Sequence, residues 1–261
     1  MSKLELVVPT VWEEGAPPGW VVMDPLEKLK AKYCYDYSMT LEFDLYGARR
    51  SSDVGWADRL EGANLCATHL MNSQIETDDV EGLLQRRTAI GDSLAGVPRD
   101  VDLAGANLDN GSLRGKLERL FIAFRVPGVG IAKATKVLCL KRPRLIPMLD
   151  SRVLEALYGT WWTGSKDPIV FAGEILDGMT RFQQLMNWPT SNGSTNLQIL
   201  MKLSEEISAG LESCLRRLVI LAPHPIITPV RVLDNLLWFD WWGYKYFGYR
   251  YNEAARRIEP E

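Results

Sequence analysis

Apolar residues recur at helical spacing along much of the chain. Between positions 113 and 124 they stand at 113, 117, 120, 121 and 124, which form one face of a helix with 3.6 residues per turn. Similar stripes predict helices at 169–187, 195–221 and 229–242. The segment 33–47 suits either a strand or an aromatic helix, and residues 1–25, rich in proline and glycine, look irregular. The pattern as a whole predicts an all-α fold.

Composition narrows the class of protein. The chain has 261 residues, of which 46% are hydrophobic and 24% charged, so it is long enough for a large globular domain. No apolar run approaches the ~20 residues of a membrane span, and the first residues carry acids, so we expect a cytoplasmic protein with no membrane partner. Four scattered cysteines and two histidines, His69 and His224, argue against a metal site and a Ser-His-Asp triad.

Charge is distributed unevenly along the sequence. The net charge is −3, yet residues 125–144 contain six basic residues and no acid, which leaves −9 for the rest of the chain. A local basic face on an acidic body can still bind phosphates, because the patch matters more than the sum. The six residues are Arg125, Lys133, Lys136, Lys141, Arg142 and Arg144.

A glycine-rich turn lies at the start of this basic run. In Val126–Gly130, Pro127 fixes one backbone angle, while Gly128 and Gly130 permit conformations and close approaches that other residues resist. Between two helices, this sequence predicts a tight hairpin. Its backbone N–H groups, with the start of the next helix, could hold an anion such as a DNA phosphate. A tight turn without a ligand is the alternative.

The spacing around this turn resembles the helix-hairpin-helix DNA glycosylase superfamily. The family pattern is a hydrophobic residue, Pro-Gly-Val/Ile-Gly, a helix, an apolar run, and an aspartate about twenty residues past the second glycine. Here Pro127-Gly128-Val129-Gly130 is followed by Asp150, although Ile131 stands where arginine or threonine is common. The resemblance covers residues 113–157. The whole chain, including RPRLIPMLDSRV, is also similar to an uncharacterised, largely actinobacterial family of bacterial proteins.

The resemblance implies a role for Asp150. In the family, an aspartate at this position stabilises the positive charge that develops on the sugar when an N-glycosidic bond breaks, as a carboxylate is suited to do. The alternative is an N-cap of the helix expected after it, and both roles can hold at once. The resemblance also implies that DNA is bound by the hairpin and nearby cations: Pro127, Gly128, Val129, Gly130, Lys133, Lys136 and Arg142.

Two further features of the family are absent from the sequence. The lysine of strand-cutting members would fall on Ala132, and Lys133 is ~100° away around the helix, so the resemblance implies a monofunctional enzyme. The clustered cysteines of an iron–sulfur centre are also lacking. Family members can bind a monovalent cation on hairpin carbonyls. We expect no other cofactor.

A glycosylase holds its flipped base between aromatic or apolar walls. Two groups of aromatic residues could supply them, with Trp161, Trp162, Trp238 and Trp241 as candidates. Aromatic residues at helical spacing are more often part of a core. Asp234, four residues before Trp238, is expected to be either solvated or paired with Arg231 rather than to act in catalysis.

The fold implied by the resemblance has two lobes with a cleft between them. We expect one lobe at 75–158 and a second built from 1–74 and 159–261. The implied activity is removal of a modified or damaged base by a monomeric enzyme, in repair or in defence against phage DNA with hypermodified or glucosylated bases. A non-catalytic DNA-binding module and a protein-interaction domain are the alternatives.

Overall fold

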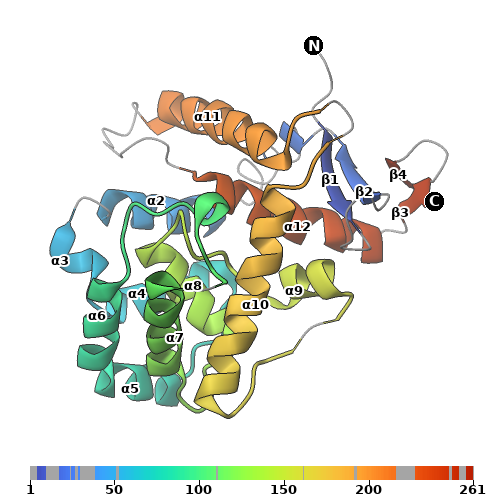
Figure 1. Cartoon of the computed structure of the whole chain (residues 1–261). Helices are drawn as coiled ribbons and strands as arrows, with labels where there is room; N and C mark the ends of the chain where they lie inside the picture. The colour runs from blue at the N-terminus through green and yellow to red at the C-terminus, as the bar shows by residue number, and fades with distance from the viewer. Residues whose placement is uncertain are drawn as a thin grey trace.

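A computed structural model describes most of the chain. The described residues are 5–9, 18–23, 25–26, 29, 39–50, 53–109, 111–160, 162–190, 193–215, 227–246, 249–252 and 257–260. Helices dominate these residues, as the apolar stripes predict (Figure 1). None of the helices in the described part is long and apolar enough to cross a membrane.

The helices follow one another along the chain with short connections. They are α2 (Met39–Arg50), α3 (Val54–Ala57), α4 (Gly62–Ala67), η1 (Thr68–Met71), α5 (Thr77–Gln85), α6 (Arg87–Gly96), η2 (Leu103–Gly105), α7 (Ser112–Phe124), α8 (Ile131–Lys141), α9 (Ser151–Tyr158), α10 (Pro168–Met186), α11 (Asn196–Leu215) and α12 (Pro229–Tyr246). The undecided segment 33–47 thus contributes a helix, α2, from Met39 onward.

Two small strand pairs accompany the helices, and the prediction of a mainly helical fold is confirmed. β1 (Glu5–Pro9) pairs antiparallel with β2 (Pro18–Met23), and β3 (Tyr249–Asn252) pairs with β4 (Arg257–Pro260). The proline-rich start had looked irregular because its prolines and glycines obscure the alternation. Leu6 and Val22 are partners in the ladder, and both are buried. The fold is therefore mainly helical, with one two-stranded pair from each end of the chain.

One large core joins the two predicted lobes. Its buried residues run from Leu6 to Leu237 and include the inward faces of α7, α8, α10 and α12. The long helix α10, which the prediction assigned to the second lobe, packs against α7 of the first (Figure 1). A smaller cluster around Trp56 and Cys139 lies between α3 and the last turns of α8. The two-lobed division with its boundaries at 75 and 158 stays a prediction.

Candidate functional site

The hairpin between α7 and α8 depends on its glycines. Gly128 has a φ of +81°, in the left-handed region that favours glycine. A Cβ added there would stand 1.9 Å from Oδ1 of Asp79. Asp79 in turn accepts hydrogen bonds from the Glu76 N–H, at 3.0 Å, and from Lys133 Nζ, at 2.6 Å. The turn therefore closes over a carboxylate that α5 supplies, and Lys133 neutralises that carboxylate.

A second close approach fixes the other side of the hairpin. A Cβ on Gly130 would stand 2.6 Å from the Thr163 carbonyl oxygen, which accepts the N–H of Ile131 at 3.0 Å. The loop before α10 therefore lies directly on the first turn of α8. Among the described residues, the Gly128 and Gly130 N–H groups donate no backbone hydrogen bond. Those two donors could serve a bound anion.

Arg125 occupies the carbonyl side of the hairpin. Its guanidinium donates to the carbonyl oxygens of Val126 and Val129, at 2.5 and 3.3 Å, and to that of Ser165 at 2.7 Å. A monovalent cation on the hairpin would use such oxygens. The chain provides positive charge there itself, so these residues fit a guanidinium better than a bound ion.

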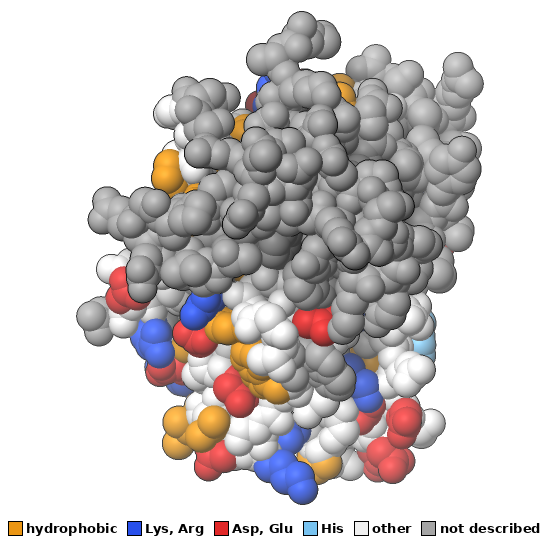
Figure 2. Space-filling view, turned by 90° about the vertical axis from the view of Figure 1, so that its right-hand side faces the viewer, with side chains coloured by type: hydrophobic (Ala, Val, Ile, Leu, Met, Phe, Trp, Pro, Cys, Tyr) orange, Lys and Arg blue, Asp and Glu red, His pale blue; other side chains and the backbone are white. Residues whose placement is uncertain are grey.

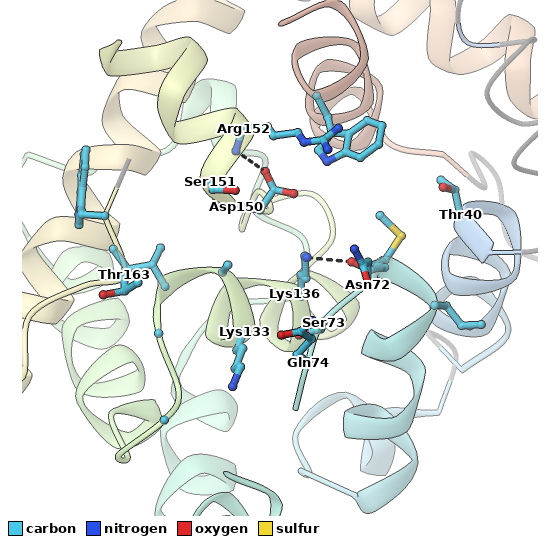
Figure 3. A pocket seen from close by; sticks show the side chains of 18 residues that line it. Thr40, Asn72, Ser73, Gln74, Lys133, Lys136, Asp150, Ser151, Arg152 and Thr163 are labelled. Carbon is cyan, nitrogen blue, oxygen red and sulfur yellow. Dashed lines mark hydrogen bonds between the residues drawn. The ribbon is translucent and has the colours of Figure 1, made fainter. Parts of the chain in front are cut away.

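Asp150 is the N-cap of α9. Its Oδ1 accepts the N–H groups of Arg152 and Val153, at 3.0 and 3.1 Å, which is the capping role expected as an alternative to catalysis. Oδ2 receives no hydrogen bond from the described residues. The side chain is half-buried and lines a cavity, toward which Figure 3 shows it pointing. Capping therefore leaves one carboxylate oxygen for a ligand.

The segment before Asp150 is held on two sides. The Leu149 N–H donates to Oγ1 of Thr135 in α8, at 3.0 Å, and the Met148 N–H to Oδ2 of Asp234 in α12, at 3.3 Å. Asp234 pairs with Arg231 at 2.5 Å and is buried, which decides between the two roles expected for it in favour of the pair. Burial raises the pKa of Asp234, and the Arg231 guanidinium opposes that rise. Asp234 therefore supports the Asp150 backbone from within the core.

The cavity, called the Asp150 cleft below, has a volume of about 840 Å³. It is lined by parts of α2, η1, the hairpin, α8, α9, the loop before α10, and α12 (Figure 3). The described lining residues are Thr40, Leu70, Met71, Asn72, Ser73, Gln74, Gly128, Gly130, Ile131, Ala132, Lys133, Lys136, Asp150, Ser151, Arg152, Trp162, Thr163 and Trp238. The hairpin and the aspartate, separated along the chain, thus share one cavity.

Two of the four candidate tryptophans reach this cleft. Trp162 is half-buried and packs edge-on against Tyr158, with ring centroids 4.9 Å apart. Trp238 has the Arg152 guanidinium over its ring, 4.1 Å from the centroid. Trp161 lies outside the described residues, as does the side chain of Trp241. The lining of the cleft therefore includes two aromatic side chains, one of which already has a cation stacked on it.

The two lysines predicted to bind phosphate have different surroundings. Lys136 is buried, and its Nζ donates to the Met71 carbonyl oxygen at 2.8 Å. Burial lowers its pKa, which the Asp150 charge partly restores. Figure 3 shows Lys136 pointing toward Asp150 and Lys133 pointing away from it. Lys136 thus faces the cleft interior rather than an open surface, and Lys133 is engaged by Asp79.

Arg142 corrects the predicted DNA contact at that position. Its side chain is fully buried and donates to Oδ1 of Asp58, at 2.7 Å, and to the carbonyl oxygens of Leu94 and Val97. It is not placed to reach a phosphate. An arginine directly after Lys141 gives no sign, in sequence alone, that it will be enclosed by residues 45 to 84 positions away.

The basic run as a whole does not form a patch. Lys141 is buried, with Nζ 2.8 Å from the Trp56 carbonyl oxygen and 3.7 Å from the centre of the Trp56 ring. Arg144 pairs with Asp102. On the face in Figure 2, acidic and basic side chains of the described residues are interspersed rather than gathered by sign. The predicted basic face is therefore replaced by internal contacts.

The sequence reasoning missed one wall of the cleft. Asn72, Ser73 and Gln74, called the polar edge below, follow η1 and lie beside Lys136, across from Asp150 (Figure 3). Asn72 has a φ of +53°, unusual outside glycine, which turns the chain after η1. Ser73 is 4% exposed, and its Oγ has no partner among the described residues. No motif marks three such common residues.

Comparison with known proteins gives a family without an assigned activity. Neither a curated protein nor a solved structure matches the chain. Residues 31–240 match the model of a family of unknown function, DUF6308. This range contains the hairpin, Asp150, the polar edge, Trp162 and Trp238. Since the match covers most of its length, the chain belongs to the family of unknown function DUF6308.

Proposed function

We propose that the protein is a monofunctional DNA glycosylase, which binds DNA at the hairpin and removes a modified base in the Asp150 cleft. One observation carries the proposal: the Asp150 carboxylate and the hairpin glycines line the same cavity. The acid stabilises the positive charge on the sugar, and the hairpin N–H groups hold a neighbouring phosphate. Trp162 and Trp238 supply aromatic surface for the extruded base.

The free oxygen of Asp150 supports a chemical role. An aspartate that only caps a helix can use its carboxylate for that purpose in any surroundings. Here Oδ2 is left without a donor, and Lys136 brings a cation near it inside the cleft. A carboxylate held by two N–H groups and by the ties on Leu149 and Met148 is also fixed in position, which favours catalysis because little reorganisation is needed.

Strand-cutting members of the helix-hairpin-helix glycosylase superfamily carry a lysine at a position that is Ala132 here, and Ala132 lines the cleft. The product in this proposal is therefore an intact strand with an abasic site. Water attacks the sugar carbon as the bond to the base breaks; the base leaves with the bonding electrons, and the proton that the water gives up ends on the base. Asp150 orients that water and stabilises the cationic sugar.

The test is release of a base from DNA. The full chain is incubated with duplexes that each carry one modified base, and released nucleobases are identified by mass spectrometry. We expect wild type to release at least one. Asp150→Asn keeps an oxygen for the α9 cap and removes the charge, so release should fall by about 100-fold or more while DNA affinity is retained.

The matched control is Asp177→Asn. Asp177 is a carboxylate in α10 that accepts a hydrogen bond from Tyr158 and lies outside the lining of the cleft. It should release the base at the wild-type rate. No release by wild type from any substrate would rule out the enzyme, and equal release by wild type and Asp150→Asn would rule out the role of the carboxylate.

A DNA-binding module is the second candidate, and the cap geometry favours it. Both N–H contacts of Asp150 are those of an N-cap, so the residue has a complete structural purpose. In that case the hairpin binds DNA and no base is ever released. Binding that weakens with rising salt, without base release, would identify this alternative.

A further inference from the structure

We infer that Thr135 is a positioning residue, which fixes the Asp150 carboxylate at a set distance from the hairpin. This inference rests on the proposed function, in which the hairpin and the carboxylate act on the same stretch of DNA. Thr135 is fully buried in α8 and does not belong to the described lining of the Asp150 cleft. It is therefore shielded from a substrate, and its effect on the reaction must pass through Asp150 or the hairpin.

The Thr135 hydroxyl joins these two segments. Its Oγ1 accepts the Leu149 N–H at 3.0 Å and donates to the Ile131 carbonyl oxygen at 2.9 Å. A hydroxyl has one hydrogen and two lone pairs, so both bonds can exist together. Ile131 directly follows the hairpin, and Leu149 directly precedes Asp150. One side chain thus connects the hairpin end of α8 to the backbone that presents the acid.

Leu149 is held through both its side chain and its N–H. A Cβ added to Gly178 of α10 would stand 2.7 Å from Leu149 Cδ1, so the Leu149 side chain lies directly against that helix. The Leu149 N–H donates no backbone hydrogen bond among the described residues, and the Thr135 hydroxyl is its acceptor. Without that hydroxyl, the N–H would lack a partner in the interior, which costs free energy. The segment before Asp150 would then shift to regain one.

Packing alone does not require a hydroxyl at position 135. Buried residues around it in α8 are apolar, namely Ala134, Val137 and Leu138. A valine has the same branched shape and would fill the same space. The bond to the Ile131 carbonyl oxygen is one that threonine often makes within a helix. The bond from Leu149, 14 residues along the chain, is instead specific to this fold.

The other tie on this segment also stabilises a buried cation. Asp234 accepts the Met148 N–H at 3.3 Å and pairs with Arg231. Removal of that carboxylate would take a partner from a buried guanidinium, and the core would respond. Thr135 is uncharged, so its hydroxyl can be removed without uncovering a charge. Position 135 therefore allows the link between hairpin and acid to be broken by itself.

The test compares Thr135→Val with Thr135→Ser in the full chain. The valine loses the hydroxyl and keeps the shape, whereas the serine keeps the hydroxyl and loses a buried methyl group. On a duplex from which wild type releases a base, Thr135→Val should lower the single-turnover release rate by about tenfold to 100-fold, with DNA affinity within about twofold. Thr135→Ser should stay within about threefold of the wild-type rate. Thermal unfolding of each variant shows whether a lower rate reflects only a loss of folded protein.

The matched control is Thr180→Val in α10. Oγ1 of Thr180 also donates to the carbonyl oxygen four residues earlier, that of Leu176, at 2.9 Å. It lies outside the described cleft lining and receives no backbone N–H from the described residues. This variant should release the base at the wild-type rate.

A second measurement needs no catalysis and uses the amide signals of the full chain in NMR spectra. The Leu149 N–H should exchange with solvent about tenfold faster in Thr135→Val than in wild type, because it loses its acceptor. The amide signals of Arg152 and Val153, whose N–H groups bind Asp150 Oδ1, should shift in the same variant. Thr135→Ser should stay close to wild type in both respects.

The outcomes separate this inference from the proposed function. Unchanged exchange at Leu149 in Thr135→Val would overturn the inference, and so would a serine variant that releases the base as slowly as the valine variant. If exchange and the two amide signals respond as expected but wild type releases no base from any DNA, the glycosylase proposal fails alone. If wild type releases a base and Thr135→Val releases it as fast, the inference fails and the glycosylase stands.

Discussion

The two ends of α8 contain the same kinds of residue in opposite settings. At its start, Lys133 and Lys136 lie at the cleft with the hairpin and Asp150. At its end, Lys141 is buried against Trp56, and Arg142, the residue after the helix, is enclosed by Asp58 and backbone carbonyls. Each cation in this short segment meets a different partner. The difference shows that basic residues close in sequence need not make a basic surface.

The physical reason lies in how the helix is enclosed. The start of α8 has the glycine turn on one side and an open cavity on the other, so its polar groups remain within reach of a ligand. Its last turn is covered by α3 and the segment after α6, whose carbonyl oxygens need donors. Cations at the end of α8 satisfy the fold, whereas Lys133 and Lys136 line the cavity and are held there by Asp79 and the Met71 carbonyl oxygen.

The largest expected effect on stability concerns the C-terminal end of α8. Arg142→Met removes a buried guanidinium that Asp58 and three carbonyl oxygens outside its own helix use. We expect the free energy of unfolding to fall by about 3–5 kcal/mol, because buried groups lose their partner. Urea denaturation measures it. Arg144→Met, which removes an exposed pair with Asp102, should cost less than about 1 kcal/mol. Equal losses would show that Arg142 is not structural.

A smaller loss is expected at the hairpin. Gly128→Ala places a methyl group 1.9 Å from an oxygen of Asp79, at a φ of +81°. We expect the free energy of unfolding to fall by roughly 1–3 kcal/mol from backbone strain, together with displacement of the Asp79–Lys133 pair. Gly210→Ala in α11 meets open space and is the control, for which no loss is expected. A stable Gly128→Ala protein would contradict the hairpin geometry.

The N-cap Asp150 should contribute less still to the free energy of unfolding. Asp150→Ala removes the oxygen that accepts two N–H groups at the start of α9, and we expect a loss of about 1 kcal/mol in thermal or urea unfolding. Asp150→Asn keeps a capping oxygen and should stay within about 0.5 kcal/mol of wild type. A large loss in the asparagine variant would mean that the charge itself stabilises the fold.

The smallest effect is a dependence on pH. Burial lowers the pKa of Lys136 from 10.5, so below that value the folded chain binds fewer protons at this amine than the unfolded chain does. Stability should therefore increase as the pH rises from the folded pKa toward 10.5. Unfolding midpoints measured across alkaline pH should show this rise in wild type and less of it in Lys136→Met. Parallel profiles would show that Lys136 is not desolvated.

Much of the fold followed from local patterns. The stripe at 113–124 became α7, and the helices expected at 169–187 and 229–242 appear as α10 and α12 within a few residues. At the start of α5 the acids Glu76, Asp78, Asp79 and Glu81 follow closely, and Asp79 is the one that accepts the N–H of Glu76. Local spacing thus predicted the helices well and their first residues less well, because several acids compete for one cap.

The sequence by itself determined the helices, the glycine turn, and the fixed offset from that turn to Asp150, because these depend on neighbours a few residues apart. Only the tertiary structure decided which cations face the cleft. Lys133 meets Asp79 across 54 residues, Lys136 meets Met71 across 65, and Arg142 meets Asp58 across 84. The tertiary structure also decided that the polar edge lies at the cleft. Partners at such separations leave no periodic signal in the chain, since packing alone brings them together.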